Sequence, residues 1–412
     1  MAGKDIIINK FYGINNQISK KVINNTQFVD ALNFDVTGDV KNGLLLKTRD
    51  KWKKIKDLVD GHSLFATKKS MFFIDNDDLF ICDKNFNYEI IDSGYRGLDT
   101  SYCYFNNTLF ISNEKFIKRY KNGKIYNLTP EKFNNEHLIT ENVNGLLNPA
   151  TYLIACTFVY DDGIEGPCSN PIKYILTSNG GIKIKDFPAI TDYNIDKIRV
   201  YVSRENSTIL NLYGEYDIDI NEVIVNSNAT GQQLDKINLI PLQAGHIIEN
   251  FNGVLLTAKD NIVYLSKPFS YFYDNYLEYE EKITMIGVVD DGFFVSDEES
   301  VWFTNSTTQP GRVHLEDGAI INSMTKNTRN SQIHFFSKYG QFKGSAGGKI
   351  EAISSNFKPD LELIKGASLF LNRNGEERII SSFKSSGEKT GLVIRDWVKI
   401  EKVWQEFFLC IS

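Results

Sequence analysis

The chain of 412 residues is 42% hydrophobic and 13% aromatic, so it can bury a large core and is not expected to be disordered. Phe and Tyr, with 28 and 20 residues, far outnumber Trp and Met, with 4 each, and this enrichment favours strands over helices. The net charge of −6 argues against a broad basic face that grips nucleic acid, although an acidic channel through which DNA slides is compatible with it.

The first 60 residues are predicted to form an extended arm. They begin MAGKDIIINKFYG, which lacks the apolar stretch of a signal peptide. Short helical turns are expected only over 27–32 and 131–138. The chain contains no run of 18 apolar residues, so no membrane-spanning helix is predicted. The cysteines form no CxxC pair, so we predict free buried thiols in a reducing cytoplasm and no zinc or redox site. They are Cys82, Cys103, Cys156, Cys168 and Cys410.

Residues 64–92 show the clearest periodicity. Four short apolar pieces, LFAT, MFFI, LFIC and YEIID, are separated by polar turns, which is typical of antiparallel hairpins. A second set of four follows over 101–128, and its Asn122-Gly123 pair predicts a tight hairpin because both residues tolerate positive φ. Further sets begin at 246, 283, 332 and 368.

The sets recur roughly every 40 residues, a period typical of β-propeller blades with four strands each. Blades arranged around an axis cover one another and leave few open edges, which a single four-stranded sheet cannot do. We therefore predict an all-β fold, a β-propeller of five to seven blades. A pair of β-sandwiches with similar hairpins is the alternative.

Residues 148–228 differ from the sets on either side because their predicted strands are longer. TYLIACTFVYDDGIEGPCSNP is followed by GIKIKDF, NIDKIRVYVSR and LNLYGEYDI, with Gly- and Pro-containing flanks. We predict an inserted fibronectin-III-like β-sandwich. The expected organisation is an arm over 1–60, the first blades over 61–147, the inserted sandwich over 148–228 and the remaining blades over 229–412.

The arm also contains a recognisable order of residue types. FYGINNQISKKVINNTQFVDALNFDVTGDVKNG resembles the N-terminus of phage tail-hub and tail-nozzle proteins, which include the packaged-DNA stabilisation and tubular tail proteins of short-tailed phages. The matching positions are Phe11, Gly13, Ile14, Asn15, Asn16, Ala31, Asn33, Asp35, Gly38, Lys47 and Arg49. The Arg-x-Gly ending usual in that family reads Lys47-Thr48-Arg49-Asp50 in this chain.

Three later stretches resemble the same family in the same order. TFVYDDGIEGPCSNP with KIRVYVSR is similar to its inserted sandwich, HIIENFNGVLLTAKDNIVYLSKP to the blade that follows, and IHFFSKYGQFKGSAGGKIEAIS to a later blade. The resemblance extends over about 11–355. The order of the four motifs carries more weight than any one of them.

The resemblance implies a structural protein of the virion, assembled in the host cytoplasm. It implies a homo-oligomeric ring, expected to be a hexamer, around the DNA exit channel. The expected partners are portal or adaptor proteins, tail fibres or spikes, and DNA that passes without sequence specificity; no membrane insertion is expected. Eight arm residues are then candidates for contact with a neighbouring subunit: Phe11, Gly13, Ile14, Asn15, Asn16, Ala31, Asn33 and Asp35.

Acidic clusters raise an enzymatic alternative, because some five-bladed propellers are glycosidases that use paired carboxylates. Each cluster falls in a predicted hairpin turn, where Asp is favoured for backbone reasons, so we predict no catalytic residue. The clusters are Asp75, Asp77 and Asp78; Asp161, Asp162 and Glu165; and Asp290 and Asp291.

No metal or cofactor is predicted either. The DNDD run at 75–78 faintly suggests a calcium loop but lacks its glycine and its closing glutamate. The histidines are isolated in sequence, and no HExxH, nucleotide-binding or triad motif is present. They are His62, His137, His246, His314 and His334.

Two further groups are open to two interpretations. The lysines that flank Trp52 are candidate DNA-facing residues, or else they lie on a solvated strand with the indole turned inward. They are Lys51, Lys53, Lys54 and Lys56. A run of aromatic residues is expected to pack in the core or at an interface, with sugar stacking as the alternative. It comprises Phe269, Tyr271, Phe272, Tyr273 and Tyr276.

Two functions follow from these observations. The first is a non-enzymatic tail nozzle or hub that retains packaged DNA and carries fibres or spikes. The second is a carbohydrate-binding or glycoside-cleaving propeller at the virion or cell surface.

Overall fold

The structure is a computed structural model that describes residues 34–39, 43–48, 57–327, 329–353, 363–373 and 376–385. Asp35 lies within the described residues, in strand β1 (Phe34–Asp39). The other seven arm candidates lie outside them, as do the four DNA-facing lysine candidates, Lys51, Lys53, Lys54 and Lys56.

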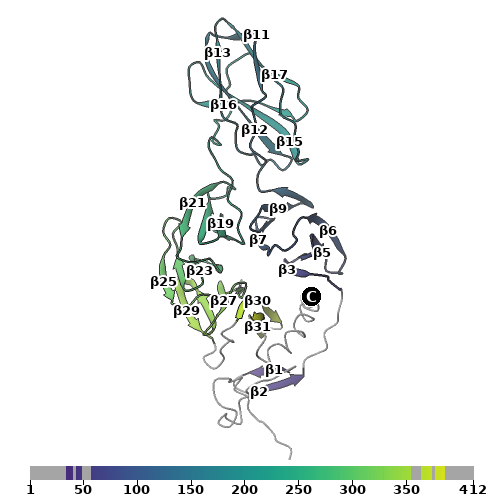
Figure 1. The fold of residues 1–412 in the computed structure, drawn as a ribbon, viewed down its shortest axis with the longest axis vertical. Coiled ribbons are helices and arrows are strands. Elements are labelled where there is room, and N and C mark those ends of the chain that lie inside the picture. The colour runs from purple at the N-terminus through teal and green to yellow at the C-terminus, as the bar shows by residue number, and fades with distance from the viewer. Residues whose placement is uncertain are drawn as a thin grey trace, which may run out of the picture.

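The described residues contain six four-stranded antiparallel sheets, and five of them are the blades of an all-β propeller. Figure 1 shows the blades arranged in a ring. Blade 1 comprises β3 (Gly61–Ala66), β4 (Met71–Asp75), β5 (Asp78–Cys82) and β6 (Tyr88–Ser93). Blade 2 comprises β7 (Ser101–Phe105), β8 (Thr108–Ser112), β9 (Ile117–Lys121) and β10 (Lys124–Asn127). Blade 3 comprises β18 (Ile247–Phe251), β19 (Val254–Lys259), β20 (Ile262–Ser266) and β21 (Tyr273–Glu278). Blade 4 comprises β22 (Met285–Val289), β23 (Gly292–Ser296), β24 (Val301–Thr304) and β25 (Arg312–Leu315), and blade 5 comprises β26 (Thr325–Asn327), β27 (Gln332–Ser337), β28 (Gly340–Ser345) and β29 (Lys349–Ala352).

Tight turns set the hairpins of the blades. The predicted Asn122-Gly123 turn is confirmed: Lys121 pairs with Lys124, and the two turn residues have φ values of 53° and 84°. Such left-handed conformations favour Asn and Gly, and they match the twist of the strands that they connect. A single hydrogen-bonded turn, from Leu138 N to Asn135 O, occurs within 131–138.

Neighbouring blades pack against each other through shared apolar clusters, because the side chains of a strand alternate between its two faces. In β8, Leu109 and Ile111 pack into the cluster between blades 1 and 2, whereas Phe110 packs into the cluster between blades 2 and 3. In β23, Phe293 faces blade 3 and Phe294 faces blade 5. Successive side chains point to opposite faces of a strand, so one buried strand supplies both neighbours.

A hydroxyl at the end of the second strand binds the segment that enters the next blade. Ser112 Oγ lies 2.6 Å from Gly245 O and accepts a 3.3 Å hydrogen bond from Gly245 N, just before blade 3. Ala319 N donates in the same way to Ser296 Oγ at 2.8 Å, ahead of blade 5. We call these contacts the serine clamps.

The inserted module contains two sheets. One has the strand order β11-β14-β17 and the other β13-β12-β15-β16, and a single apolar cluster lies between them. The strands are β11 (Ile139–Leu147), β12 (Ala150–Tyr160), β13 (Ile172–Leu176), β14 (Gly180–Lys185), β15 (Ile195–Ser203), β16 (Leu210–Asp217) and β17 (Glu222–Val225). Since β11 belongs to the first sheet, the predicted boundary at 148 falls inside the module. Its fibronectin-III-like character stays a prediction. In Figure 1 the module projects from one side of the ring.

Two further hairpins complete the described structure. β30 (Leu363–Arg373) pairs with β31 (Glu376–Ser385), and β1 pairs with β2 (Gly43–Thr48). Each forms a separate two-stranded sheet. The last predicted set, beginning at 368, therefore appears as one hairpin among the described residues.

Candidate functional site

The junction between blade 2 and the inserted module contains a buried ionic network. Arg119 of β9 is fully buried. Its Nη1 donates to Asp162 Oδ2 at 2.8 Å, and its Nε donates to the carbonyl of Leu128 at 2.9 Å. The guanidinium also lies over the rings of Tyr126, Tyr160 and Tyr271, with 4.9, 5.7 and 5.1 Å to the centroids. One cation thereby joins blade 2, the module and blade 3.

The two carboxylates that follow β12 have defined structural partners. Asp162 also lies 3.4 Å from Lys121 Nζ, and its side chain is 7% exposed. Asp161 accepts a 2.8 Å hydrogen bond from the Tyr126 hydroxyl and forms an ion pair with Lys124. Burial by itself would raise the pKa of Asp162, but the hydrogen bond and charge of Arg119 outweigh it, so the pKa lies below its ordinary value. Both groups are therefore held as anions that fasten the module to blade 2.

Other polar groups extend the same contact. The Tyr160 hydroxyl donates to Asp192 Oδ2 at 2.7 Å, and Asn194 Nδ2 donates to the carbonyl of Ile125 at 2.9 Å. Desolvation, the hydrogen bond to Asp192 and the charge of that carboxylate raise the pKa of Tyr160, so the phenol stays protonated. Glu165 lies outside this network. It accepts hydrogen bonds from the Thr157 and Tyr201 hydroxyls at 2.6 Å each.

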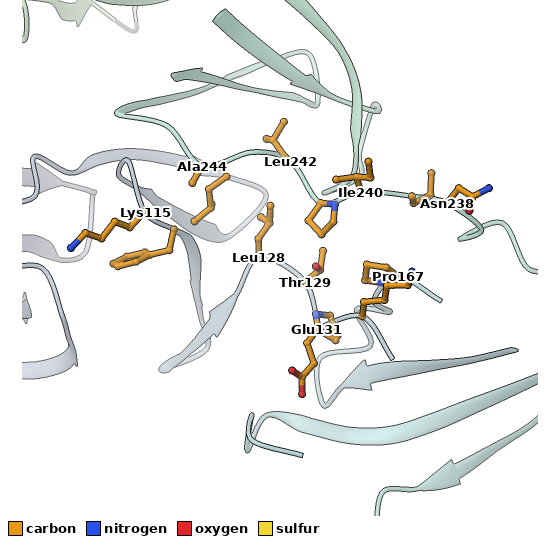
Figure 2. Close-up of a pocket in the computed structure, with 15 residues that line it drawn as sticks. Lys115, Leu128, Thr129, Glu131, Pro167, Asn238, Ile240, Leu242 and Ala244 are labelled. Atoms are coloured by element: carbon orange, nitrogen blue, oxygen red, sulfur yellow. The ribbon is translucent and has the colours of Figure 1, made fainter. Parts of the chain in front are cut away.

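A groove of about 670 Å³ lies beside this network. One wall is the chain that leaves blade 2, residues 128–132, and the other is the returning segment 238–244. Figure 2 shows Leu128 and Thr129 facing Ile240 and Leu242 across it. Leu128 and Leu242 are buried, whereas Ile240 is 55% exposed. The two chain segments that connect the module to the ring thus run side by side.

A second pocket, of about 380 Å³, lies among the innermost strands. Its lining includes Phe105 of blade 2, Asn250 of blade 3, Asp290 after β22, and Asn327 and Gln332 of blade 5. We call it the axial pocket. Lys326, which also lines it, forms an ion pair with Glu249, so a bridge joins blades 3 and 5 in this region.

The remaining acidic candidates, apart from Asp290, accept hydrogen bonds from other segments of the chain. Asp75 Oδ1 accepts from Val59 N at 2.8 Å and from Asp60 N at 2.9 Å. Asp77 Oδ1 accepts from Arg96 N at 3.0 Å, and Asp78 Oδ1 accepts from the Ser93 hydroxyl at 2.7 Å. Asp291 accepts from Gly347 N at 2.8 Å. The expected role of these residues was local to their turns, whereas the contacts join each of them to a segment 15 to 56 positions away. Asp290 lines the axial pocket.

The described residues contain no group of three or more His, Cys, Asp or Glu side chains that could hold a metal ion. His246 is partly buried, with Nε2 2.7 Å from the carbonyl of Ile283, and desolvation lowers its pKa despite that contact. The four cysteines in this part of the chain, Cys82, Cys103, Cys156 and Cys168, form no disulfide bond and are buried, as predicted. None of its helices is long and apolar enough to cross a membrane.

Four of the five aromatic candidates fall into two groups. Phe272 is buried, and Tyr271 packs edge-on against Phe110 as well as beneath Arg119. Phe269 and Tyr276 are 78% and 48% exposed. The expectation of core packing therefore holds for Tyr271 and Phe272, while Phe269 and Tyr276 present large apolar surface to solvent.

Sequence reasoning missed the residue at the centre of the junction. Arg119 sits in the strand piece FIKRY, where a cation is expected to face water. Its partner Asp162 lies 43 positions away, and no local pattern connects the two.

Comparison with known proteins gives likenesses among solved structures. No protein-family model and no curated protein matches the chain. A structure of BBS1N in complex with ARL6DN is 10% identical and covers 83% of this chain and 98% of that chain, with a TM-score of 0.32. Hsv2 of Kluyveromyces lactis is 8% identical over 82% of this chain and 89% of that chain, with a TM-score of 0.26. The N-terminal domain of Nup159 is 10% identical and covers 72% of this chain and 78% of that chain, also with a TM-score of 0.26.

Proposed function

We propose that this chain is a structural subunit of a phage tail, a nozzle or hub protein that assembles into a ring around the DNA exit channel. The ordered set of motifs from the arm to the later blades supports this assignment, and the junction supports a mechanical role. Breaking a buried ion pair is strongly destabilising, so the Arg119–Asp162 pair favours one fixed geometry of propeller and module.

In this proposal the subunit is a spacer and a platform and performs no catalysis. A homo-oligomeric ring, six-fold by family resemblance, would bind portal or adaptor proteins on one side and fibres or spikes on the other. The virion would be its place of action. The module, which projects from the ring of blades, is a suitable platform because its position is fixed by the buried network (Figure 1).

In this proposal the DNA channel lies outside the axis of each propeller, and the ion pair between Glu249 and Lys326 supports this position. The Glu249–Lys326 pair and Cys103, which is buried beside both, occupy the region between innermost strands. DNA would therefore pass through the centre of the assembled ring, outside the axis of each propeller. An acidic or neutral wall would let phosphates pass without adhering.

The proposal is tested by locating the protein in particles and measuring its assembly. Electron microscopy of virions labelled on this chain should place it at the tail, next to the portal. Light scattering after size exclusion should show a ring for the full chain, whereas a variant lacking residues 1–50 should be a folded monomer. A protein absent from the tail would contradict the proposal, and a ring formed without the arm would contradict the role of the arm.

The axial pocket favours one second candidate, a carbohydrate-binding or glycoside-cleaving propeller. Its amide side chains, Asn250, Asn327 and Gln332, lie near Asp290 and the Phe105 ring, a combination that suits sugar hydroxyls. Glycan-array binding that is lost in Asp290→Ala, or turnover of a glycan, would favour this candidate over the tail protein.

A further inference from the structure

A tyrosine at the edge of the junction between blade 2 and the module is held out in solvent. Tyr193 lies two residues before β15 and is fully exposed. Single exposed apolar residues are common on protein surfaces and by themselves indicate nothing. What distinguishes Tyr193 is that the residues on both sides of it are fixed to the rest of the molecule.

Hydrogen bonds hold both neighbours of Tyr193. Asp192 Oδ2 accepts from the Tyr160 hydroxyl at 2.7 Å, and Asn194 Nδ2 donates to the carbonyl of Ile125 at 2.9 Å. Asn194 N also donates to Asp192 Oδ1 at 3.0 Å, which closes the turn. We call residues 192–194 the pinned turn. Because its backbone is already ordered, binding through the exposed tyrosine would cost little further chain entropy.

The groove of about 670 Å³ on the same junction has the properties of a receptor for an aromatic side chain. Its lining includes Leu128, Leu242 and the half-exposed Ile240 (Figure 2). Three prolines share this lining: Pro130, Pro167 and Pro241. Proline side chains lose no rotamer freedom when they are covered, so the groove offers apolar walls at a low entropic cost.

The charges around the groove and around the pinned turn are complementary. The groove is lined by two lysines, Lys115 and Lys132, and by one carboxylate, Glu131. Asp186 and Asp196, on either side of the pinned turn in sequence, are exposed. The lysines next to these aspartates are each paired with a carboxylate: Lys185 with Glu141, and Lys197 with Glu215 and Asp217. Opposite charge on two surfaces favours their encounter and orients them.

We propose that Tyr193 of one copy of this chain inserts into the groove of a second copy and so joins neighbouring subunits. This inference rests on the proposed ring of subunits. The pinned turn contacts β10, the outermost strand of blade 2, whereas the returning wall of the groove is bonded to blade 3, where Leu242 N donates to Tyr271 O at 2.9 Å. Two different surfaces therefore meet, and such a heterologous contact generates a closed ring when its rotation closes.

Tyrosine is well suited to this role. A few aromatic or arginine anchors supply most of the binding energy of a typical protein interface, and they do so in pockets that exclude water. A tyrosine side chain has two torsions to fix and combines a large apolar surface with a polar tip. The groove and the pinned turn together provide the pocket and the anchor on one chain.

Photo-cross-linking in the assembled full chain tests the contact directly. Photoreactive benzoylphenylalanine, which keeps an aromatic ring, is placed at position 193 of ¹⁵N-labelled chains, and these are mixed with unlabelled natural chains, assembled and irradiated. Mass spectrometry should find position 193 of a labelled chain joined to residues 128–132 or 238–244 of an unlabelled chain. An assembled ring whose cross-links lie elsewhere, or within one chain only, would overturn the inference and leave the proposed function standing. A full chain that stays monomeric would overturn both.

Point variants give an independent readout. Tyr193→Ala should leave the thermal denaturation of the subunit unchanged, because the side chain is fully exposed. Loss of the anchor should raise the subunit concentration at which half of the assembly dissociates by about thirtyfold or more. Ile240→Glu, in the groove, should weaken assembly in the same direction. Tyr104→Ala is the matched control, since it removes another exposed tyrosine, from the innermost strand of blade 2.

Assembly of Tyr193→Ala that is as strong as that of Tyr104→Ala would contradict the inference. Should Ile240→Glu lose its fold, the cross-linking experiment decides whether the groove receives the tyrosine.

Discussion

The two places where this ring of blades departs from simple repetition are built very differently. At the junction with the inserted module, Arg119 is fully buried among three tyrosines, the Leu128 carbonyl and Asp162. At the contact that closes the ring, the β30–β31 hairpin is connected to blade 1 by the Lys365–Asp99 pair, whose side chains are 40% and 54% exposed. The contact that holds the module is therefore buried, whereas the contact that closes the ring is largely exposed to solvent.

The largest loss of stability is expected when the anion at the junction, Asp162, is removed. Asp162→Ala leaves the buried Arg119 guanidinium without its charge partner, and we expect a loss of about 3–5 kcal/mol in the free energy of unfolding. Urea titration followed by tryptophan fluorescence measures it. Lys124→Ala is the control, because its side chain is 57% exposed and its removal should cost about 0–1 kcal/mol. Equal losses for the two variants would show that the junction is no stronger than the surface.

The serine clamps predict a smaller effect between blades. Ser112→Ala leaves both Gly245 N–H and C=O without the hydroxyl that pairs with them in a buried site, at a cost of about 1–3 kcal/mol. Ser296→Ala should behave similarly because it frees Ala319 N–H. Ser178→Ala, at an exposed turn position, is the control for thermal denaturation measurements. A clamp variant as stable as this control would contradict the role of the hydroxyls.

Acid should weaken the junction gradually. Because the folded pKa of Asp162 lies below its unfolded value, the carboxylate stabilises the fold above about pH 4 and loses that effect as the pH falls through the folded pKa. Hydrogen exchange of the module strands at pH 6 and pH 3 measures the change. The Asp162→Ala variant should show a weaker pH dependence, and an identical profile would mean that another group titrates.

The ring closure should give the smallest response. Lys365→Ala removes an exposed ion pair, so the expected loss of stability is about 0–1 kcal/mol and should diminish further in high salt. Thermal melts at two ionic strengths measure it. A loss as large as that of Asp162→Ala would mean that the closure is as firmly built as the junction.

Local sequence patterns were sufficient for the blades because their information is local. Each hairpin is specified by a short apolar strand, a polar turn and another strand, and the Asn122-Gly123 turn formed where it was expected. The five sheets lie within or beside the predicted sets. The prediction of a β-propeller therefore held without any long-range information.

Long-range contacts explain what the sequence did not predict. β11 contains Asn142, Asn144 and Gly145, residue types depleted in strands, and pairing with β14 outweighs that preference. Arg119 is buried because the module brings Asp162 to it from a distant part of the chain. The serine clamps join segments as far apart as Ser112 and Gly245. None of these partners can be identified from spacing alone.

The clamp between Ser112 and Gly245 has a consequence for the order of folding. Its two residues are 133 positions apart, and closing a flexible loop of that length carries a substantial entropic cost. The intervening module is a sandwich with its own core, and the segments entering and leaving it run side by side along the groove in Figure 2. Once the module has folded, the effective loop shrinks to these two short segments. We therefore expect the module to acquire its structure before blades 2 and 3 meet, so that slow refolding of the module delays the whole ring.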